Sequence, residues 1–286
     1  MTTYQNFNNI THGTPMPGYG VLLDLGKLKS AHLYHSATKT EFLAQITQEL
    51  DFWKMQLADG IMLIDKMVAV AGIWSNLNYL SEFIRANEFS KQQKTIINSL
   101  LKPLTPDELD IGEGFISESN TMFLQIKSMN SSLFDLEFML LQPNATMNLF
   151  YQYFTKPLIS LSQMNLKEFI QTLHADSFNQ RREKVESLIS FTPDSLYNYN
   201  GKTMVTTNYC LACRDYIARV HDVNNIMNLV KLQILLKETA MTAMEQAVKN
   251  SEIINPYTDK AYDFDPTNNW LKFDCIDARS KCRIKL

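Results

Sequence analysis

The chain has 286 residues, a formal net charge of −3 and a pI near 6.0, and its sequence contains no basic block. This charge excludes the basic footprint of a nucleic-acid-binding protein, so we expect no nucleic-acid partner. Nine glycines and nine prolines are too few for a sandwich or barrel, which needs turn residues every 8 to 12 positions or so. A chain of this length buries roughly three quarters of its unfolded surface and needs no metal or disulfide for stability.

We expect an irregular lead-in over residues 1–20. Two prolines and three glycines fall between Gly13 and Gly20, and proline both fixes φ and lacks a backbone donor. No basic start followed by an apolar run of about 7 to 15 residues is present, so the sequence predicts no secretory signal. Residues 21–33 then predict a short helix.

The strongest helical pattern runs from Glu41 to Ile84. Apolar residues recur along it every three or four positions, which predicts α-helix. From Ile61 to Trp74 the chain is apolar nearly all round, as expected of a helix covered on several sides. We interpret this part as the long central helix of a multi-helix bundle. It is too short and too charged to span a bilayer, which takes about 20 apolar residues.

Asp65 and Lys66 are the only charges between Gly60 and Ser75. An unpaired charge taken out of water costs several kcal/mol, so each must reach the rim of the core or meet an opposite charge. A solvent-facing edge or a structural ion pair explains both residues. A buried polar site is the alternative, and it makes both of them candidate binding residues.

Weaker helical patterns occupy the middle of the chain, at residues 92–101, 144–154, 164–173 and 182–189. Residues 109–141 predict either one helix and one short extended piece or two helices broken near residue 130. Pro143 and Asn144 predict a helix start at which a side-chain oxygen caps a free amide. Asn144 and Asn148 are candidate binding residues.

Residues 191–207 predict a loop centred on Asn200-Gly201. Helical spacing returns between Tyr209 and Met244, and we expect two helices here, separated between His221 and Asn225. A charged cluster surrounds that point. A structural network that holds Arg219 against a carboxylate explains it, and an acid–base site is the alternative. Arg219 and Asp222 are therefore candidate binding residues.

The pattern changes after residue 250. Asn255 to Lys260 predicts a turn, and residues 261–264, 270–275 and 281–286 predict short strands. We therefore expect a β-hairpin or meander over 251–286, packed on a helical domain over 21–250. The whole is a mainly α fold.

The four cysteines form two pairs, Cys210 with Cys213 and Cys275 with Cys282. The second spacing is longer than zinc sites use, and no βαβ pattern supports a redox CxxC, so we expect no metal and no cofactor. Cys275 and Cys282 can close a hairpin as a disulfide if their Cα atoms lie within about 7 Å. Buried thiols are the alternative. The chain contains none of the common catalytic motifs, and we expect no catalytic residues.

Several stretches together resemble a group of uncharacterised proteobacterial proteins. They are Asp51-Phe-Trp53, Leu63 to Ala71, Gln142 to Asn148, Tyr216 to Asp222 and Asn255 to Lys260. The resemblance spans most of the chain and implies one N-terminal membrane helix, followed by a helical part that faces the periplasm. It implies no known activity. This chain has Asp259 where the group usually has glycine, and it starts where the anchor would end, so either an anchor was removed or the protein is a soluble relative.

We therefore expect a non-catalytic bacterial envelope protein, a helical periplasmic scaffold or binding module for a protein partner at the inner membrane. It would meet the membrane only through an N-terminal anchor absent from this chain. One alternative is an enzyme with a polar site between helices that uses Asp65, Lys66, Arg219 and Asp222. Another is a soluble cytoplasmic adaptor or secreted effector. A disulfide between Cys275 and Cys282 would disfavour the cytoplasm.

Overall fold

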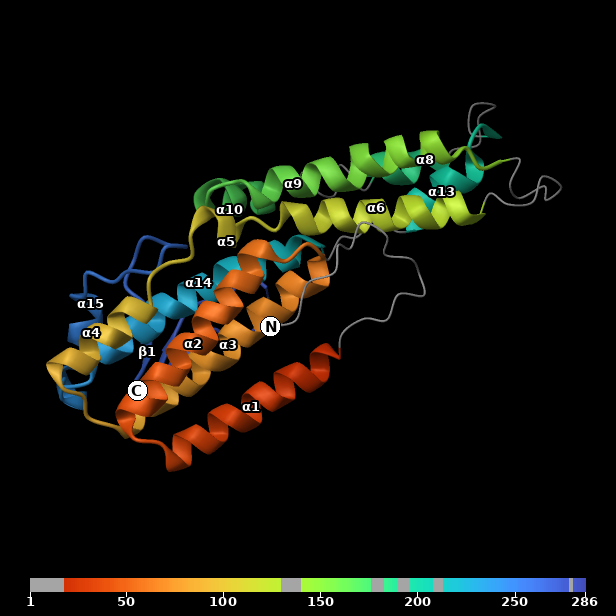
Figure 1. Ribbon diagram of the computed structural model, residues 1–286. Coiled ribbons are helices and arrows are strands. Elements are labelled where there is room, and N and C mark those ends of the chain that lie inside the picture. Colours follow the sequence, from red (N-terminus) through yellow and green to blue (C-terminus); the bar gives the residue numbers. More distant parts are fainter. Residues whose placement is uncertain (1–17, 130–139, 176–182, 190–195, 208–212, 278–279) are drawn as a thin grey trace. The chain divides into compact units, whose positions relative to one another are not determined.

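The computed structural model describes residues 18–129, 140–175, 183–189, 196–207, 213–277 and 280–286. Helices dominate, and a three-stranded antiparallel sheet lies near the C-terminus (Figure 1), which confirms the predicted mainly α fold with a C-terminal meander. The described residues divide into two compact units. The first unit contains Ile61–Leu63 and Gly112–Arg214, and the second contains Gly18–Gly60, Ile64–Ile111 and Asp215–Leu286. The predicted helical range 21–250 thus has parts in both units.

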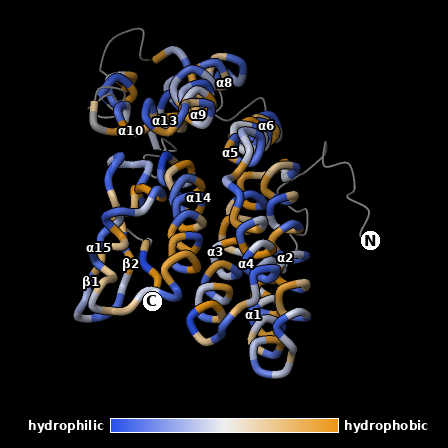
Figure 2. Tube along the Cα trace, turned by 90° about the vertical axis from the view of Figure 1, so that its left-hand side faces the viewer, coloured by the Kyte–Doolittle hydropathy of each residue, from blue (hydrophilic) through white to orange (hydrophobic). Residues whose placement is uncertain are grey.

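The second unit contains the sheet and most of the long helices. Its elements are α1 (Tyr19–Ser36), α2 (Lys39–Asp59), α3 (Leu63–Ala86), α4 (Lys91–Leu100), α5 (Pro106–Leu109), α14 (Cys213–Leu236), a 3₁₀ turn η3 (Met241–Ala243), α15 (Met244–Lys249), β1 (Asp263–Asp265), β2 (Trp270–Lys272) and β3 (Arg283–Lys285). Hydrophobic residues recur along α3 and α14 (Figure 2). Their fully buried side chains include Leu77, Leu80, Ile84, Val223, Met227 and Val230.

Three helices of this unit begin with reciprocal side-chain caps. At α2 the Thr38 side chain accepts a bond from the Glu41 amide, and the Glu41 carboxylate accepts one from the Thr38 amide at 2.8 Å. Ser90 with Gln93 begins α4 in the same way, and Thr105 with Glu108 begins α5. Each pair satisfies two amides that have no partner within the helix, so the local sequence determines where these helices start.

Two helices, α2 and α3, carry the apolar pattern from Glu41 to Ile84. The chain leaves the helix at Gly60, which has extended backbone angles of φ −61° and ψ 126°. The interpretation of this stretch as one continuous helical face is therefore wrong at residues 60–62. The residues after Gly60 are as apolar as a helix interior, so their spacing gives no sign of the break.

Lys66 lies directly after this break. Its side chain is 1% exposed, and its ammonium nitrogen donates to the carbonyl oxygens of Leu57 at 2.8 Å, Ala58 at 3.2 Å and Asp110 at 3.4 Å. Leu57 and Ala58 belong to the last turn of α2, where carbonyls lack helical partners and the helix dipole is negative. A buried cation therefore caps the C-terminus of α2. Asp65, the other predicted charge, accepts a hydrogen bond from the Tyr19 hydroxyl.

The predicted split between His221 and Asn225 is also wrong, because α14 runs unbroken from Cys213 to Leu236. His221, Asp222 and Asn225 are buried within it, with exposed fractions of 5%, 0% and 1%. These polar residues suggested a helix end, but they form a buried face of one continuous helix.

The described secondary-structure elements of the first unit are all helices or helical turns. It contains α6 (Gly112–Met129), α8 (Pro143–Phe150), a π-helical turn η1 (Tyr151–Thr155), α9 (Lys156–Ser162), α10 (Leu166–His174), a 3₁₀ turn η2 (Ser187–Ile189) and α13 (Tyr199–Thr207). The helix α6 accounts for the start of residues 109–141, and the predicted break near residue 130 lies outside the described residues.

Two predictions in this unit are wrong. Asn144 is not the cap of α8, because Pro143 occupies the first helical position and Gln142 the cap. The side chain of Asn198 supplies the missing acceptor instead, since its oxygen accepts from the Gln142 amide at 2.8 Å and from the Thr146 hydroxyl at 2.9 Å.

The second error is the loop expected over 191–207. Its described end, Tyr199–Thr207, is the helix α13. Asn198 precedes it in the left-handed region, at φ 57°, which asparagine tolerates better than most residues. Gly201 lies within the helix because a Cβ atom there would overlap Thr146 and Asn198. Glycine therefore serves close packing at this position and does not form a turn.

The sheet has the order β1-β2-β3 with antiparallel neighbours. Leu271 pairs with Ile284 across β2 and β3, and both are buried, whereas Lys272 pairs with Arg283 and both are exposed. One sheet face therefore joins the core and the other carries charge.

A substitution at Gly72 on α3 tests how closely α2 packs on α3. A Cβ atom at Gly72 would overlap the Trp53 indole, which is 4% exposed. We expect Gly72→Ala to lower the free energy of unfolding by about 1–3 kcal/mol, since overpacking forces side chains or backbone to shift. Urea denaturation measures this change.

Gly26 on α1 is the matched control, because nothing lies within 4 Å of its added Cβ atom. We expect Gly26→Ala to leave stability unchanged or to raise it by about 0.5–1 kcal/mol, through helix propensity. Equal stability of Gly72→Ala and the unchanged protein would contradict the α2–α3 packing described here.

Candidate functional site

Asp222 on α14 anchors the C-terminal segment of the chain. Its carboxylate accepts hydrogen bonds from the Ile276 amide at 2.9 Å, the Asp277 amide at 3.0 Å and the Tyr257 hydroxyl at 2.8 Å. The side chain is fully buried. Both carboxylate oxygens are therefore engaged by groups far along the sequence.

Arg219 lies one helical turn before Asp222. Its Nε donates to Asp277 at 2.6 Å, and its guanidinium lies 5.2 Å from the centroid of the Tyr216 ring. The carboxylate expected opposite Arg219 is thus that of Asp277, which is 3% exposed. Asp277 is held at both ends, because its amide binds Asp222 and its side chain binds Arg219.

Asn225 extends this network by one further turn. Its amide nitrogen donates to the Asn255 side chain at 3.0 Å, and its oxygen accepts from the Tyr262 hydroxyl. The Asn255 side-chain oxygen also accepts from the Tyr257 amide at 3.0 Å. One face of α14 therefore holds both the turn at residues 255–260 and the segment before β3.

Sequence reasoning missed Asn225, Asn255, Tyr257, Tyr262 and Asp277 as members of this network. The Asn255-Pro-Tyr turn was recognised, but only as a turn. A signal was available in the spacing of Arg219, Asp222 and Asn225, which places three polar groups one turn apart on one side of the helix.

Burial shapes the protonation of this network. It raises the pKa of Asp222, and the bonds from Ile276, Asp277 and Tyr257 oppose that rise without cancelling it. Burial also raises the pKa of the Tyr257 hydroxyl, and the neighbouring Asp222 carboxylate adds to this rise. Asp222 and Tyr257 are bonded to each other, so the arrangement ties the C-terminal segment to α14.

Cys275 and Cys282 form a disulfide with a Cα–Cα distance of 5.6 Å. Their sulfurs and a carboxylate oxygen of Asp222 lie within 4.8 Å of one another. Because the sulfurs are bonded to each other, they are not available as thiolate ligands for a metal. Cys213 is also disulfide-bonded. The described cysteines are therefore all oxidised.

The other candidate residues lie elsewhere. Asp65 and Lys66 make the contacts described above at the start of α3. Asn144 and Asn148 are exposed on α8 of the first unit, one helical turn apart. Of the six predicted binding residues, the described network unites Arg219 and Asp222.

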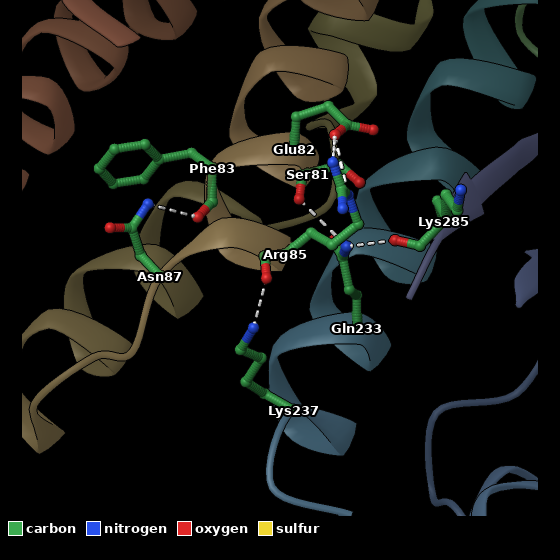
Figure 3. Close-up of polar contacts among 8 residues, drawn as sticks. All are labelled: Ser81, Glu82, Phe83, Arg85, Asn87, Gln233, Lys237 and Lys285. Carbon is green, nitrogen blue, oxygen red and sulfur yellow. Dashed lines mark hydrogen bonds and ion pairs between the residues drawn. The ribbon is translucent and has the colours of Figure 1, made fainter. Parts of the chain in front are cut away.

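A second polar junction joins α3, α14 and β3 (Figure 3). The Gln233 amide nitrogen on α14 donates to the carbonyl oxygens of Ser81 at 3.1 Å and Lys285 at 2.7 Å. Lys237, one turn further on, donates to the Arg85 carbonyl at 2.6 Å near the end of α3. These bonds fix strand β3 and α3 to the same helix.

The outer side of α1 carries an exposed apolar strip, which we define as Val21, Leu25 and Leu28. Their exposed fractions are 65%, 58% and 68%. The opposite side of α1 meets α3, where Tyr34 contacts the ring of Phe83 and Tyr79 donates to the Lys27 carbonyl. Helix α1 therefore has one packed side and one apolar side that is open in the described structure.

Comparison with protein families, with curated proteins and with solved structures finds no match for this chain. The resemblance to uncharacterised envelope proteins stays a prediction. None of the described helices is both long and apolar enough to cross a bilayer.

His221 provides a pH test of the buried face of α14. Burial lowers its pKa from 6.5 to about 4. The unfolded chain therefore binds an extra proton between about pH 6.5 and pH 4, and stability falls as the pH falls through that window. We expect His221 alone to contribute a loss of about 2–3 kcal/mol between pH 7 and pH 4.5, measured by urea denaturation at each pH as the difference from a variant without this histidine.

A His221→Gln variant should lose correspondingly less over the same interval. The raised pKa of Asp222 acts in the opposite sense, because a proton bound in the folded state favours folding as the pH falls. That contribution is present in both proteins and cancels in the comparison. An equal loss in both proteins would refute the assignment to His221.

Proposed function

We propose that this chain is a non-catalytic bacterial envelope protein whose helical scaffold binds a protein partner on the periplasmic side of the inner membrane. The observation that carries the proposal is the exposed apolar strip on α1. Exposed apolar surface of this kind commonly marks an interaction site. The candidate polar site, by contrast, is closed, because Asp222 and Arg219 bind other parts of the chain.

The spacing of the strip favours a helical partner. Val21, Leu25 and Leu28 are separated by four and then three positions. The polar residues His32 and His35 occupy the next two positions of the same spacing. Apolar positions that alternate in this way form the seam of paired helices. We therefore take the partner's contact to be an amphipathic helix laid along α1.

Charges beside the strip define that helix further. Asp24 lies directly before Leu25, and Lys29 lies directly after Leu28, so the two charges flank the strip on opposite sides. Paired helices exchange salt bridges at these positions. A partner helix with a basic residue facing Asp24 and an acidic residue facing Lys29 would complement α1. The side chains of Asp24 and Lys29 are 75% and 49% exposed. Each has an ion-pair partner within the chain, Lys27 at 3.0 Å for Asp24 and Glu49 at 2.6 Å for Lys29, so the partner helix would exchange with these pairs.

The oxidised cysteines support a compartment outside the cytoplasm, because disulfides persist there and are rare in reducing compartments. In the source bacterium, Cys275 and Cys282 should resist an alkylating reagent until a reductant is added, as measured by the mass of the intact protein. Complete alkylation before reduction would contradict an envelope location and favour a cytoplasmic adaptor.

Photo-crosslinking in the source bacterium tests the strip. A photoreactive residue at Leu25 should crosslink to another protein, whereas the same residue at exposed Gln92 on α4 should not. The peptide crosslinked at Leu25, identified by mass spectrometry, should belong to a helix with apolar residues spaced three and four apart. Leu28→Asp should abolish the product, because it puts a charge into the seam.

Leu28→Asp should keep the melting temperature of the unchanged chain, since Leu28 is 68% exposed and exposed substitutions usually change stability by less than about 0.5 kcal/mol. A crosslink only to lipid, to a second copy or within the same chain would each overturn the proposed partner helix. A product that persists in Leu28→Asp would overturn the role of the strip.

A further inference from the structure

A cavity of about 370 Å³ lies between α3 and strands β2 and β3 of the second unit. Its lining includes two tryptophans and three cations: Trp74, Trp270, Lys281, Arg283 and Lys285. This volume falls in the range of pockets that hold small molecules. The cavity is separate from the strip on α1 and from the network around Asp222.

The charge of this lining is positive. Glu82 also lines the cavity, but its carboxylate is bound by Arg85 at 2.9 and 2.7 Å (Figure 3). The charges of Lys281, Arg283 and Lys285 therefore exceed the negative charge around them. All three side chains are exposed, so a ligand can reach them from solvent.

The register of the sheet concentrates these cations further. Arg283 lies directly opposite Lys272 across β2 and β3, and like charges in that position repel. Asp263 on β1 lies on the other side of Lys272 and offsets its charge. No such acid is paired with Arg283, because β3 is the edge of the described sheet.

A second cavity of about 350 Å³ adjoins this region. It is lined by three cations, Lys281, Arg283 and Lys272, and by one acid, Asp274, together with both cysteines of the disulfide. Lys281 and Arg283 therefore border both cavities, and an anion bound beside Arg283 would reduce its repulsion with Lys272.

The two tryptophans add a flat apolar surface to this charge. The Arg283 guanidinium lies 4.7 Å from the centroid of the Trp270 ring, a contact that holds its fork of donors in place. A guanidinium binds carboxylate or phosphate through two parallel hydrogen bonds, and lysines supply further point charges. The half-buried rings of Trp74 and Trp270 line the cavity and can cover an apolar part of the same ligand.

We propose that this cavity binds a small organic anion that carries two or more carboxylate or phosphate groups. Arg283 holds one group in bidentate fashion, Lys281 and Lys285 bind the other, and the two tryptophans cover the carbon skeleton. The site is independent of the proposed partner helix, so either can fail without the other.

Titration of the full chain with citrate and with pyrophosphate tests this site, with tryptophan fluorescence as the signal. We expect saturable binding of at least one probe, and the tighter one identifies carboxylate or phosphate as the preferred group. The double variant Arg283→Gln, Lys285→Gln should bind at least tenfold more weakly, since it removes charge-assisted bonds.

The matched control is Lys91→Gln, Lys249→Gln, which removes two exposed cations from elsewhere in the same unit. It should bind as tightly as the unchanged chain. Equally weak binding by both double variants would show that the anion responds only to the net charge of the protein, and this would overturn the site. Absence of binding by both probes would overturn it as well.

A measurement on the unchanged chain keeps the test valid if the double variant loses stability. Indole N–H resonances of Trp74 and Trp270 should shift when the probe is added, whereas that of Trp53, which is 4% exposed on α2, should stay in place. Shifts confined to Trp53, or no shifts at saturating probe, would overturn the proposal.

Discussion

The second unit depends on one buried carboxylate. Asp222 takes two backbone amides and a tyrosine hydroxyl from the C-terminal segment, and a buried carboxylate is tolerable only when donors of this kind surround it. Those donors come from residues 35 to 55 positions further along the chain. The position of the tail on α14 is therefore specified by hydrogen bonds, and the buried pair Leu271 and Ile284 adds apolar surface to the core.

The need of buried polar groups for hydrogen-bond partners also decides how the other polar residues of this chain are interpreted. Arg219, Asp222 and Asn225 have the composition of a catalytic cluster, but each is bonded to another part of the protein. Lys66 is a similar case, since its buried ammonium caps a helix end. Function is then better sought where groups remain accessible, on the apolar side of α1 and in the cationic cavity beside β3.

Much of the fold could be predicted from the sequence because it depends on local patterns. Caps such as Thr38 with Glu41 and the apolar spacing along α3 and α14 act within one or two helical turns. The apolar spacing hides the break at Gly60, since the residues after it are apolar, and its only local signal is the turn dipeptide Asp59-Gly60. The predicted split of α14 failed because the partners of Asp222 lie in a distant segment.

In the candidate site, too, local features could be predicted from the sequence, whereas contacts with distant segments could not. A carboxylate opposite Arg219 could be expected from the charges alone, but its identity as Asp277 depends on the path of the tail. Asn198 illustrates the limit most clearly, since it caps α8 from 56 residues away. The strip on α1 was within reach of the sequence, because Val21, Leu25 and Leu28 already show the alternating spacing.

The order of the two units along the chain has a consequence for synthesis. Gly18–Gly60 and Ile64–Ile111 of the second unit emerge from the ribosome before Gly112–Arg214 of the first, and α14 and the tail emerge last. At about 5–20 residues per second, the apolar face of α3 waits roughly 6–30 s until α14 has been synthesised. A nascent chain in this state exposes Leu77, Leu80 and Ile84 to other proteins. Chaperones that shield nascent apolar helices would therefore raise the yield of this protein more than that of one whose units are contiguous.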